Sequence, residues 1–200
     1  PFILDSYGQG KPLRLCEIPQ PALADTDVMV EIHAASVNPI DAKIRNGYFK
    51  LILPFRLPAA LGSDLAGVVT KVGARVTRFK PGDAVFGHPD ARIIGTFAEY
   101  IAVPEADLAL KPKSLSMEEA ASVPLVALTA WQALFERANV KKGDKVFIQV
   151  GSGGVGIFAI QLAKHVGAIV ATTTGGFPLL RTRLAVATMA TRLAMNRRPQ

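Results

Sequence analysis

The chain has 200 residues, of which half are apolar, 7% are aromatic and a fifth are charged. This composition is typical of a folded chain with one compact domain or two small ones, and it excludes general disorder. Its one cysteine, Cys16, excludes an intrachain disulfide and cannot by itself make a thiolate zinc site. The sequence has neither a stretch of eighteen apolar residues nor a secretion-type N-terminus, so we expect a cytoplasmic protein with no membrane partner.

The net charge of +7 is concentrated near the C-terminus. No acidic residue follows Asp144, whereas five arginines follow Gly175, so the first 175 residues have a net charge of only +2. A protein that binds the phosphate backbone of nucleic acid carries basic residues across a folded face. We therefore predict no nucleic-acid partner.

The first hundred residues are predicted to form short strands separated by turns. Residues 28–34, 65–72, 84–87 and 96–103 are rich in β-branched and apolar side chains, and glycine or proline ends several of these runs. Strands of this length and spacing indicate a small β-barrel or sandwich.

The pattern changes near Pro112. Ser116 and Glu119 fit a capping box at the start of a helix, which Pro124 interrupts. Residues 125–138 then have apolar side chains at the three- and four-residue spacing of a second helix. A strand over 145–150, a helix over 155–166 and a strand over 168–174 complete one β-α-β unit.

The turn between that first strand and its helix is the strongest local signal. It matches the pattern G-x-G-x-x-G of dinucleotide-binding folds, in the run Gly151, Ser152, Gly153, Gly154, Val155 and Gly156. Gly151 permits the tight turn, Gly153 lets the backbone approach a pyrophosphate, and Gly156 lets the helix pack against the sheet. The alternative is a glycine-rich turn with no ligand, but the order strand, turn, helix and strand favours a phosphate-binding loop.

The end of the second strand indicates which dinucleotide binds. A site for NAD usually has an acidic residue there, whereas this strand ends in Thr172, Thr173 and Thr174. Hydroxyl groups can hydrogen-bond the 2′-phosphate, so we predict NADPH as the cofactor. The alternative is that these threonines are ordinary β-branched strand residues. Arg181 and Arg183 are further candidates for pairing with the phosphate.

A second group of polar residues follows the strand over 28–34. Asn38, Asp41 and Tyr48 would suit the floor of a cleft, in which Asn38 and Tyr48 hold a carbonyl oxygen. The alternative is structural, because Asn-Pro is typical of a turn and Asp41 is placed as a helix cap.

Several segments, in this order, resemble the zinc-free branch of the medium-chain dehydrogenase/reductase superfamily, and its NADPH-dependent quinone and enone reductases in particular. The segments are "AASVNPIDAKIRNGYF", "LGSDLAGVVTKVGARVTRFKPGDAVFG", "GTFAEYIAVPEADLALKP", "VPLVALTAWQAL" and "QVGSGGVGIFAIQLAKHVGA". The resemblance implies a GroES-like β-barrel domain over residues 1–115, then an interdomain helix and one β-α-β unit of a Rossmann domain over 116–175. It also implies that Asn38, Asp41 and Tyr48 line the substrate site and that Thr129 faces the cofactor.

The zinc-dependent branch of that superfamily differs from this chain at its metal ligands. It has a cysteine where Asn38 stands and Gly-His-Glu where this chain has Gly62-Ser63-Asp64. With one cysteine and three histidines, the sequence predicts no metal site. Without a Lewis acid to deprotonate an alcohol, hydride delivery to a quinone or an α,β-unsaturated carbonyl is the favoured reaction.

Residues 176–200 form a basic tail that does not resemble the family. A complete dinucleotide fold has two β-α-β-α-β halves, and the resemblance covers one β-α-β unit. We interpret the tail as a frame-shifted or alternatively spliced end. The alternatives are a short amphipathic helix over the sheet edge and a basic membrane-surface helix. We do not expect the family-type homodimer, because its edge strand is missing. The alternative function is a truncated, catalytically impaired product that keeps a folded GroES-like domain.

Overall fold

The computed structural model of the protein describes residues 1–52, 54–90 and 93–173. The chain divides into two compact units, Pro1–Pro124 and Leu125–Gln200, which we call unit 1 and unit 2. The basic tail over 176–200 lies outside the described residues, together with the predictions made for it. Within the described part of the chain, no helix combines the length and the apolar character that crossing a bilayer requires.

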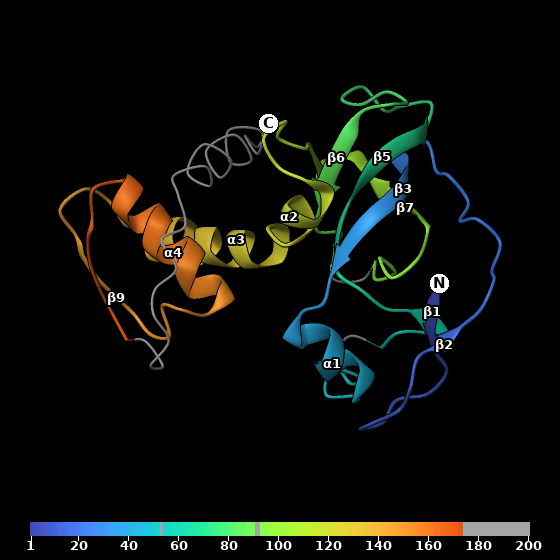
Figure 1. The fold of residues 1–200 in the computed structure, drawn as a ribbon, viewed down its shortest axis with the longest axis horizontal. Helices are drawn as coiled ribbons and strands as arrows, with labels where there is room; N and C mark the ends of the chain where they lie inside the picture. Colours follow the sequence, from blue (N-terminus) through green and yellow to red (C-terminus); the bar gives the residue numbers. More distant parts are fainter. Residues whose placement is uncertain (53, 91–92, 174–200) are drawn as a thin grey trace. The chain divides into compact units, whose positions relative to one another are not determined.

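Unit 1 is built on a five-stranded antiparallel sheet (Figure 1). Its strands, in the spatial order β7-β3-β5-β6-β8, are β7 (Tyr100–Pro104), β3 (Asp27–Ser36), β5 (Asp64–Val72), β6 (Ala84–Gly87) and β8 (Leu108–Leu110). Apolar side chains from alternate strand positions form its core, among them Val30, Val69 and Val103. Because β-branched side chains pack well on a pleated surface, the predicted runs became strands.

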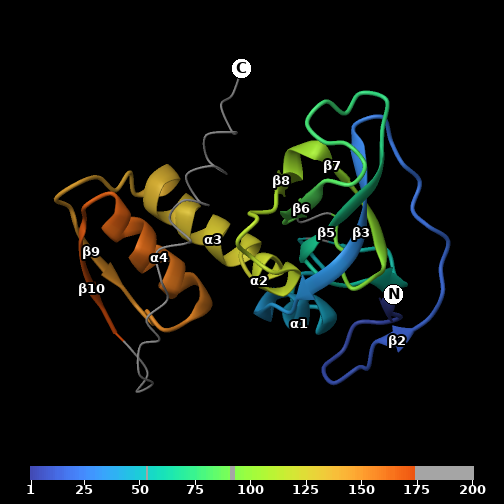
Figure 2. The ribbon, with the colours of Figure 1, turned by 45° about the horizontal axis from the view of Figure 1, so that its top comes forward.

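Unit 1 also contains a second, smaller sheet and a helix, both formed by the first sixty residues. Strands β1 (Phe2–Leu4), β2 (Arg14–Leu15) and β4 (Ala59–Ala60) pair antiparallel in the order β2-β1-β4. Helix α1 (Pro39–Arg45) directly follows β3 (Figures 1 and 2). It is fixed by Ile44, which packs with Leu4 and Leu61 in a separate core cluster.

Unit 1 extends further along the chain than the boundary at residue 115 that the sequence suggested. A short 3₁₀ helix, Glu105–Asp107, precedes β8, and helix α2 (Met117–Ala121) follows it. The predicted capping box is confirmed, since the Glu119 N–H donates to Ser116 Oγ and the Ser116 N–H donates to Glu119 Oε2. Because α2 packs against β3 and β5, it belongs to unit 1.

The described part of unit 2, which ends at residue 173, contains two helices and a parallel pair of strands. Helix α3 (Pro124–Trp131) continues as a π-helical segment, Gln132–Arg137, within the range predicted as one regular helix. Strand β9 (Lys145–Ile148), helix α4 (Gly154–His165) and strand β10 (Ile169–Thr172) form the β-α-β unit, in which β9 and β10 are parallel. A helical crossover is the usual connection between parallel neighbours.

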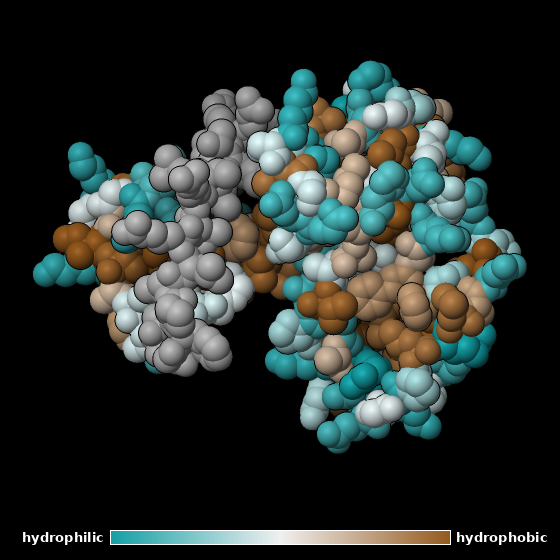
Figure 3. Space-filling view, in the orientation of Figure 1, coloured by the Kyte–Doolittle hydropathy of each residue, from teal (hydrophilic) through white to brown (hydrophobic). Residues whose placement is uncertain are grey.

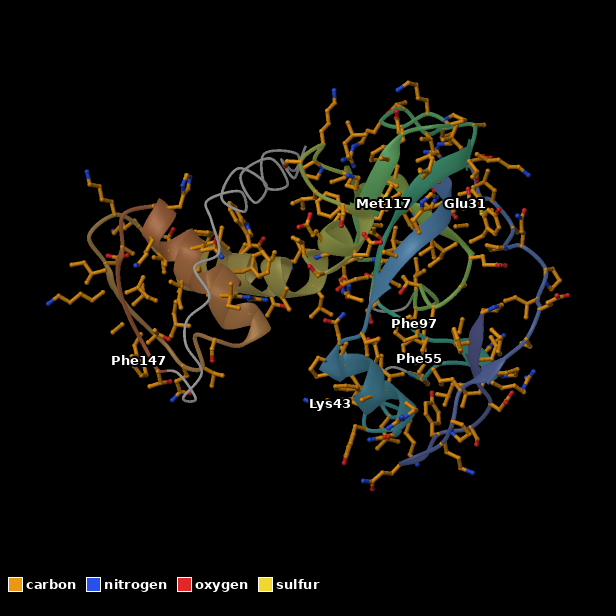
Figure 4. All side chains as sticks on the ribbon, in the orientation of Figure 1. Glu31, Lys43, Phe55, Phe97, Met117 and Phe147 are labelled. Atoms are coloured by element: carbon orange, nitrogen blue, oxygen red, sulfur yellow. The ribbon has the colours of Figure 1, made fainter. Side chains whose placement is uncertain are left out.

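One face of this two-stranded sheet is covered and the other is open. Ala130 and Leu134 pack with Leu162 of α4 to form the core of unit 2, and alternate residues of both strands face that core. On the opposite face, Phe147 (labelled in Figure 4) and Ile169 are about three-fifths exposed.

Large apolar side chains are also exposed on unit 1. Figure 3 shows apolar residues gathered on the visible face of unit 1 among hydrophilic ones. The exposed side chains of unit 1 include those of Val37, Tyr48, Leu51 and Ile52, which flank or follow α1.

Candidate functional site

The first turn of α1 holds two of the predicted site residues. Asn38 is the N-cap, with an extended backbone, and its N–H donates to Asp41 Oδ2 at 2.7 Å. The other oxygen, Asp41 Oδ1, accepts from Ser63 Oγ at 2.7 Å. Asp41 is almost completely buried, so it fixes the start of the helix and ties it to the loop before β5.

The surroundings of Asp41 raise its pKa above that of a free aspartate. Burial raises the pKa of Asp41, and the nearby Asp64 charge raises it further. The hydrogen bonds from Ser63 and Asn38 act in the opposite direction without cancelling the effect of burial.

Asp64 lies at the centre of a buried polar network. Its Oδ2 accepts from Ser36 Oγ at 2.9 Å and from Asn38 Nδ2 at 2.9 Å, while Asn38 Nδ2 also lies 3.0 Å from Ser36 Oγ. Asp64 is fully buried, so these donors replace the water that a carboxylate needs. The sequence marked Asp64 only by comparison with the zinc-dependent branch.

His88 joins this network from the end of β6. Its Nδ1 lies 2.8 Å from the Ser63 carbonyl oxygen and 3.0 Å from Asp64 Oδ1. Burial lowers the pKa of His88, but the hydrogen bond and charge of Asp64, with the Ser63 carbonyl and the Asp107 charge, together outweigh burial, and the pKa is raised overall. Strand pairing carries the signal that sequence reasoning missed, because Leu65 pairs with Gly87 and so brings residues 64 and 88 together.

Tyr48 does not join the network. It lies beyond the end of α1, where its N–H donates to the Lys43 carbonyl oxygen and its side chain is 71% exposed. The structure therefore brings Asn38 and Asp41 together and leaves Tyr48 at the surface of unit 1. Among the described residues, no group of three or more His, Cys, Asp or Glu is placed to hold a metal ion.

The glycine-rich loop of unit 2 has the close approaches that the motif requires. A Cβ on Gly156 would lie 2.3 Å from the Val150 carbonyl oxygen, and one on Gly151 would lie 2.1 Å from Thr172 Oγ1. Gly153 is the N-cap of α4, and the N–H of Ile157 is the first to bond back to it. The earlier N–H groups of the helix, those of residues 154–156, therefore have no acceptor within the helix, which is the arrangement that binds phosphate.

Val150, which precedes this loop, has an unusual backbone. Its φ is 54°, in the left-handed region that β-branched residues rarely enter. Thr173 holds it there, because Thr173 Oγ1 accepts from the Val150 N–H at 3.1 Å and the Thr173 carbonyl accepts from the Gly151 N–H at 2.8 Å. The turn of the chain at Val150 ends β9 two residues before the predicted end.

The predicted threonines differ in how their hydroxyl groups are used. Thr172 Oγ1 donates to the Ile148 carbonyl oxygen at 2.6 Å, and Thr129 Oγ1 donates to the Leu125 carbonyl oxygen at 2.7 Å. Thr173 Oγ1 accepts a hydrogen bond, and within the described residues its own proton has no acceptor, so it can be donated to a ligand. Thr174 lies outside the described residues, as do Arg181 and Arg183.

Both units are similar in sequence to known proteins. Residues 24–113 match the alcohol dehydrogenase GroES-like domain family. A 2-methylene-furan-3-one reductase of Solanum lycopersicum is 44% identical over 186 residues, which are 88% of this chain and 47% of the relative. The chain spans about half the length of the curated relatives it matches.

Solved structures match both the fold and the sequence. The quinone oxidoreductase from Coxiella burnetii is 37% identical, with a TM-score of 0.78 over 96% of this chain and 59% of that one. The Escherichia coli quinone oxidoreductase complexed with NADPH is 28% identical, with a TM-score of 0.76 over 96% of this chain and 55% of that one. These matches confirm the predicted fold class, a GroES-like domain followed by part of a Rossmann-like domain.

Proposed function

Because the chain belongs to the medium-chain dehydrogenase/reductase superfamily, with quinone oxidoreductase-like members as its relatives, we propose that it transfers hydride from NADPH to a quinone or an α,β-unsaturated carbonyl without zinc. The observation that carries the proposal is the loop at the start of α4. Gly156 is needed there because the Val150 carbonyl approaches closely, and Gly151 because the Thr172 side chain does. The first N–H groups of α4 follow and have no acceptor within the helix. A pyrophosphate fits such a cradle.

We assign the cofactor to the loop and to the end of β10. The residues that would hold the pyrophosphate are Gly151, Ser152, Gly153, Gly154, Val155 and Gly156. Thr173 is the hydroxyl that we assign to the 2′-phosphate, since Thr172 donates its proton to the backbone. When bound, the reduced nicotinamide supplies the hydride.

We assign the acceptor to unit 1, at Asn38 and Tyr48. Hydride addition leaves negative charge on the acceptor oxygen, and positioned N–H and O–H donors stabilise that charge. Asn38 offers a carboxamide whose nitrogen is oriented by Asp64, and Tyr48 offers an exposed phenol. The reduced oxygen then takes a proton from water, which completes a two-electron reduction. Asp41 acts by fixing the start of α1 rather than by contact with the acceptor.

Binding and turnover test this function on the purified chain. We expect NADPH to bind, and its absorbance to fall when a quinone or enone is added. Gly156→Val should abolish both effects, since its side chain collides with the Val150 carbonyl oxygen. If the unaltered chain shows neither NADPH binding nor turnover, the proposal is rejected. That result, together with cooperative unfolding of unit 1, would favour the catalytically impaired product.

A further inference from the structure

A chain of hydrogen bonds leads from the half-buried His88 through Asp64 to Asn38, which are both buried. We propose that His88, acting through Asp64, is a positioning residue that sets the orientation and polarity of the Asn38 carboxamide. The inference rests on the proposed function only where it takes Asn38 as the group that contacts the acceptor.

The direction of each hydrogen bond follows from the atoms involved. The neighbours of His88 Nδ1 are the Ser63 carbonyl oxygen and Asp64 Oδ1. A carbonyl oxygen and a carboxylate oxygen both accept hydrogen bonds and have no proton to donate. The ring proton must therefore lie on Nδ1, which leaves Nε2 as the atom that gains or loses a proton. Because the His88 side chain is a quarter exposed and Asp64 is buried, the ring is the member that exchanges protons with water.

The same accounting fixes the Asn38 carboxamide. Ser36 donates its hydroxyl proton to Asp64 Oδ2, so Ser36 Oγ presents a lone pair toward Asn38 Nδ2. A flipped amide would place its oxygen against two acceptors. Asp64 thus selects the orientation in which the amide nitrogen faces the network.

The three distances show that the hydrogen bonds of the Asn38 amide nitrogen are strained. They form a nearly equilateral triangle of 2.9, 2.9 and 3.0 Å among Asp64 Oδ2, Ser36 Oγ and Asn38 Nδ2. The two acceptors therefore subtend about 60° at the nitrogen, whereas its two N–H bonds diverge by about 120°, so both cannot be well aligned with them. Both hydrogen bonds of Asn38 Nδ2 are therefore bent, and a ligand oxygen aligned with one N–H would compete for it.

Protonation of His88 changes the charge that Asn38 faces. The groups whose charges act on His88 are Asp64 and Asp107, and the His88 charge in turn acts on Asp41. When Nε2 takes a proton, the Asp64–His88 pair goes from one negative charge to neutral. The Asp64 carboxylate then holds the Asn38 N–H less strongly, and the amide donor is freer to bind an acceptor oxygen.

Nuclear magnetic resonance of the 200-residue chain tests the inference without any turnover. The chain has three histidines, and His33 and His165 are exposed, so the ring signals of His88 can be assigned by single substitutions. Ring ¹⁵N shifts should show the Nδ1–H form of His88. The side-chain NH₂ signals of Asn38 should shift with pH at the midpoint of the His88 titration.

Two variants decide between positioning and a merely structural role. His88→Asn keeps an N–H donor but cannot titrate, so the Asn38 shift should disappear while the fold is kept. His33→Asn is the matched control and should leave the Asn38 shift intact. An Nε2–H form of His88, or Asn38 signals that do not follow its titration, would overturn the inference. An Asn38 shift that persists in His88→Asn would also overturn it.

A kinetic readout separates this inference from the proposed function. In the turnover assay, Asp64→Asn should lower kcat/KM by about tenfold to a hundredfold, because it removes hydrogen bonds to a charged group. If the unaltered chain turns over no substrate, the proposed function fails, while Asn38 signals that follow the titration of His88 still support the positioning role of His88.

Discussion

Replacing Val150 by glycine should stabilise unit 2. Val150 has a φ of 54°, and a left-handed backbone costs an L-residue about 1–2 kcal/mol. Glycine removes that cost but loses about 0.5–1 kcal/mol through its greater freedom in the unfolded chain. The Val150 side chain is 62% exposed, so little burial is lost with it. The expected net gain is therefore about 0.5–1 kcal/mol.

Tryptophan fluorescence provides the assay for this variant. Trp131 is the single tryptophan of the chain and packs against the core of unit 2, so its emission in urea reports the unfolding of that unit. The midpoint for Val150→Gly should rise with an unchanged slope. Val155→Gly is a matched control, because Val155 is an exposed valine in the first turn of α4. There the same change should lower stability by about 0.5–1 kcal/mol, the usual cost of glycine in a helix.

The two variants should thus have opposite signs. If Val150→Gly destabilises unit 2 as much as Val155→Gly does, the left-handed backbone stores no strain and our reasoning fails. Val150→Ile gives a second check, since it keeps the β-branched side chain and should bring no gain.

Three further predictions concern the loop and the polar network. Gly156→Ala should weaken NADPH binding at least tenfold, measured by calorimetry, because its Cβ would lie 2.3 Å from the Val150 carbonyl oxygen; unchanged affinity would contradict the proposed cradle. Ser63→Ala removes a hydrogen bond to buried Asp41 and should destabilise unit 1 by about 1–2 kcal/mol in urea, whereas the exposed Ser122→Ala should have little effect. Folding raises the pKa of His88, so protonated His88 stabilises unit 1. This stabilisation is fully present below about pH 6.5, the pKa of a free histidine, and is lost as the pH rises through the folded-state pKa. Unfolding followed across that range should show the loss, and His88→Asn should remove it.

Local pattern was sufficient for the main elements of both units. The runs that became β3, β5 and β6 are continuous stretches of apolar and β-branched residues, and the glycine-rich turn stands between a strand and a helix in the structure as predicted. In contrast, β1, β2 and β4 are two or three residues long and exist through pairing with distant partners, such as Ile3 with Ala60. No local pattern marks such strands.

The polar network depended on strand register, which the sequence could not provide. Ser36 and Asp64 face each other because they are paired residues of β3 and β5. That pairing contains two register shifts, one after Met29 and one after Ile32, and each moves later residues relative to their partners. The individual residues Asn38 and Asp41 could be selected from their place at the start of a helix, whereas their contacts with Asp64 and Ser63 required the folded sheet.

The left-handed Val150 was not predicted for a different reason. Valine is among the commonest strand residues, and the apolar residues before Val150 predict a strand that includes it. Its backbone is set by the bonds from Thr173 and by the tight turn at Gly151, both of which are tertiary.

The bond between the Val150 N–H and the Thr173 hydroxyl joins residues 23 positions apart. It has a consequence for redesigning the coenzyme preference that we propose. Any exchange at Thr173 that aims to alter recognition of the adenosine ribose also removes or replaces the acceptor of that N–H. Thr173→Val would leave the amide without its acceptor, whereas Thr173→Asp would supply a carboxylate oxygen in the same role. A switch toward NADH is therefore better attempted with an acidic side chain, which can repel the phosphate and still keep the turn in place.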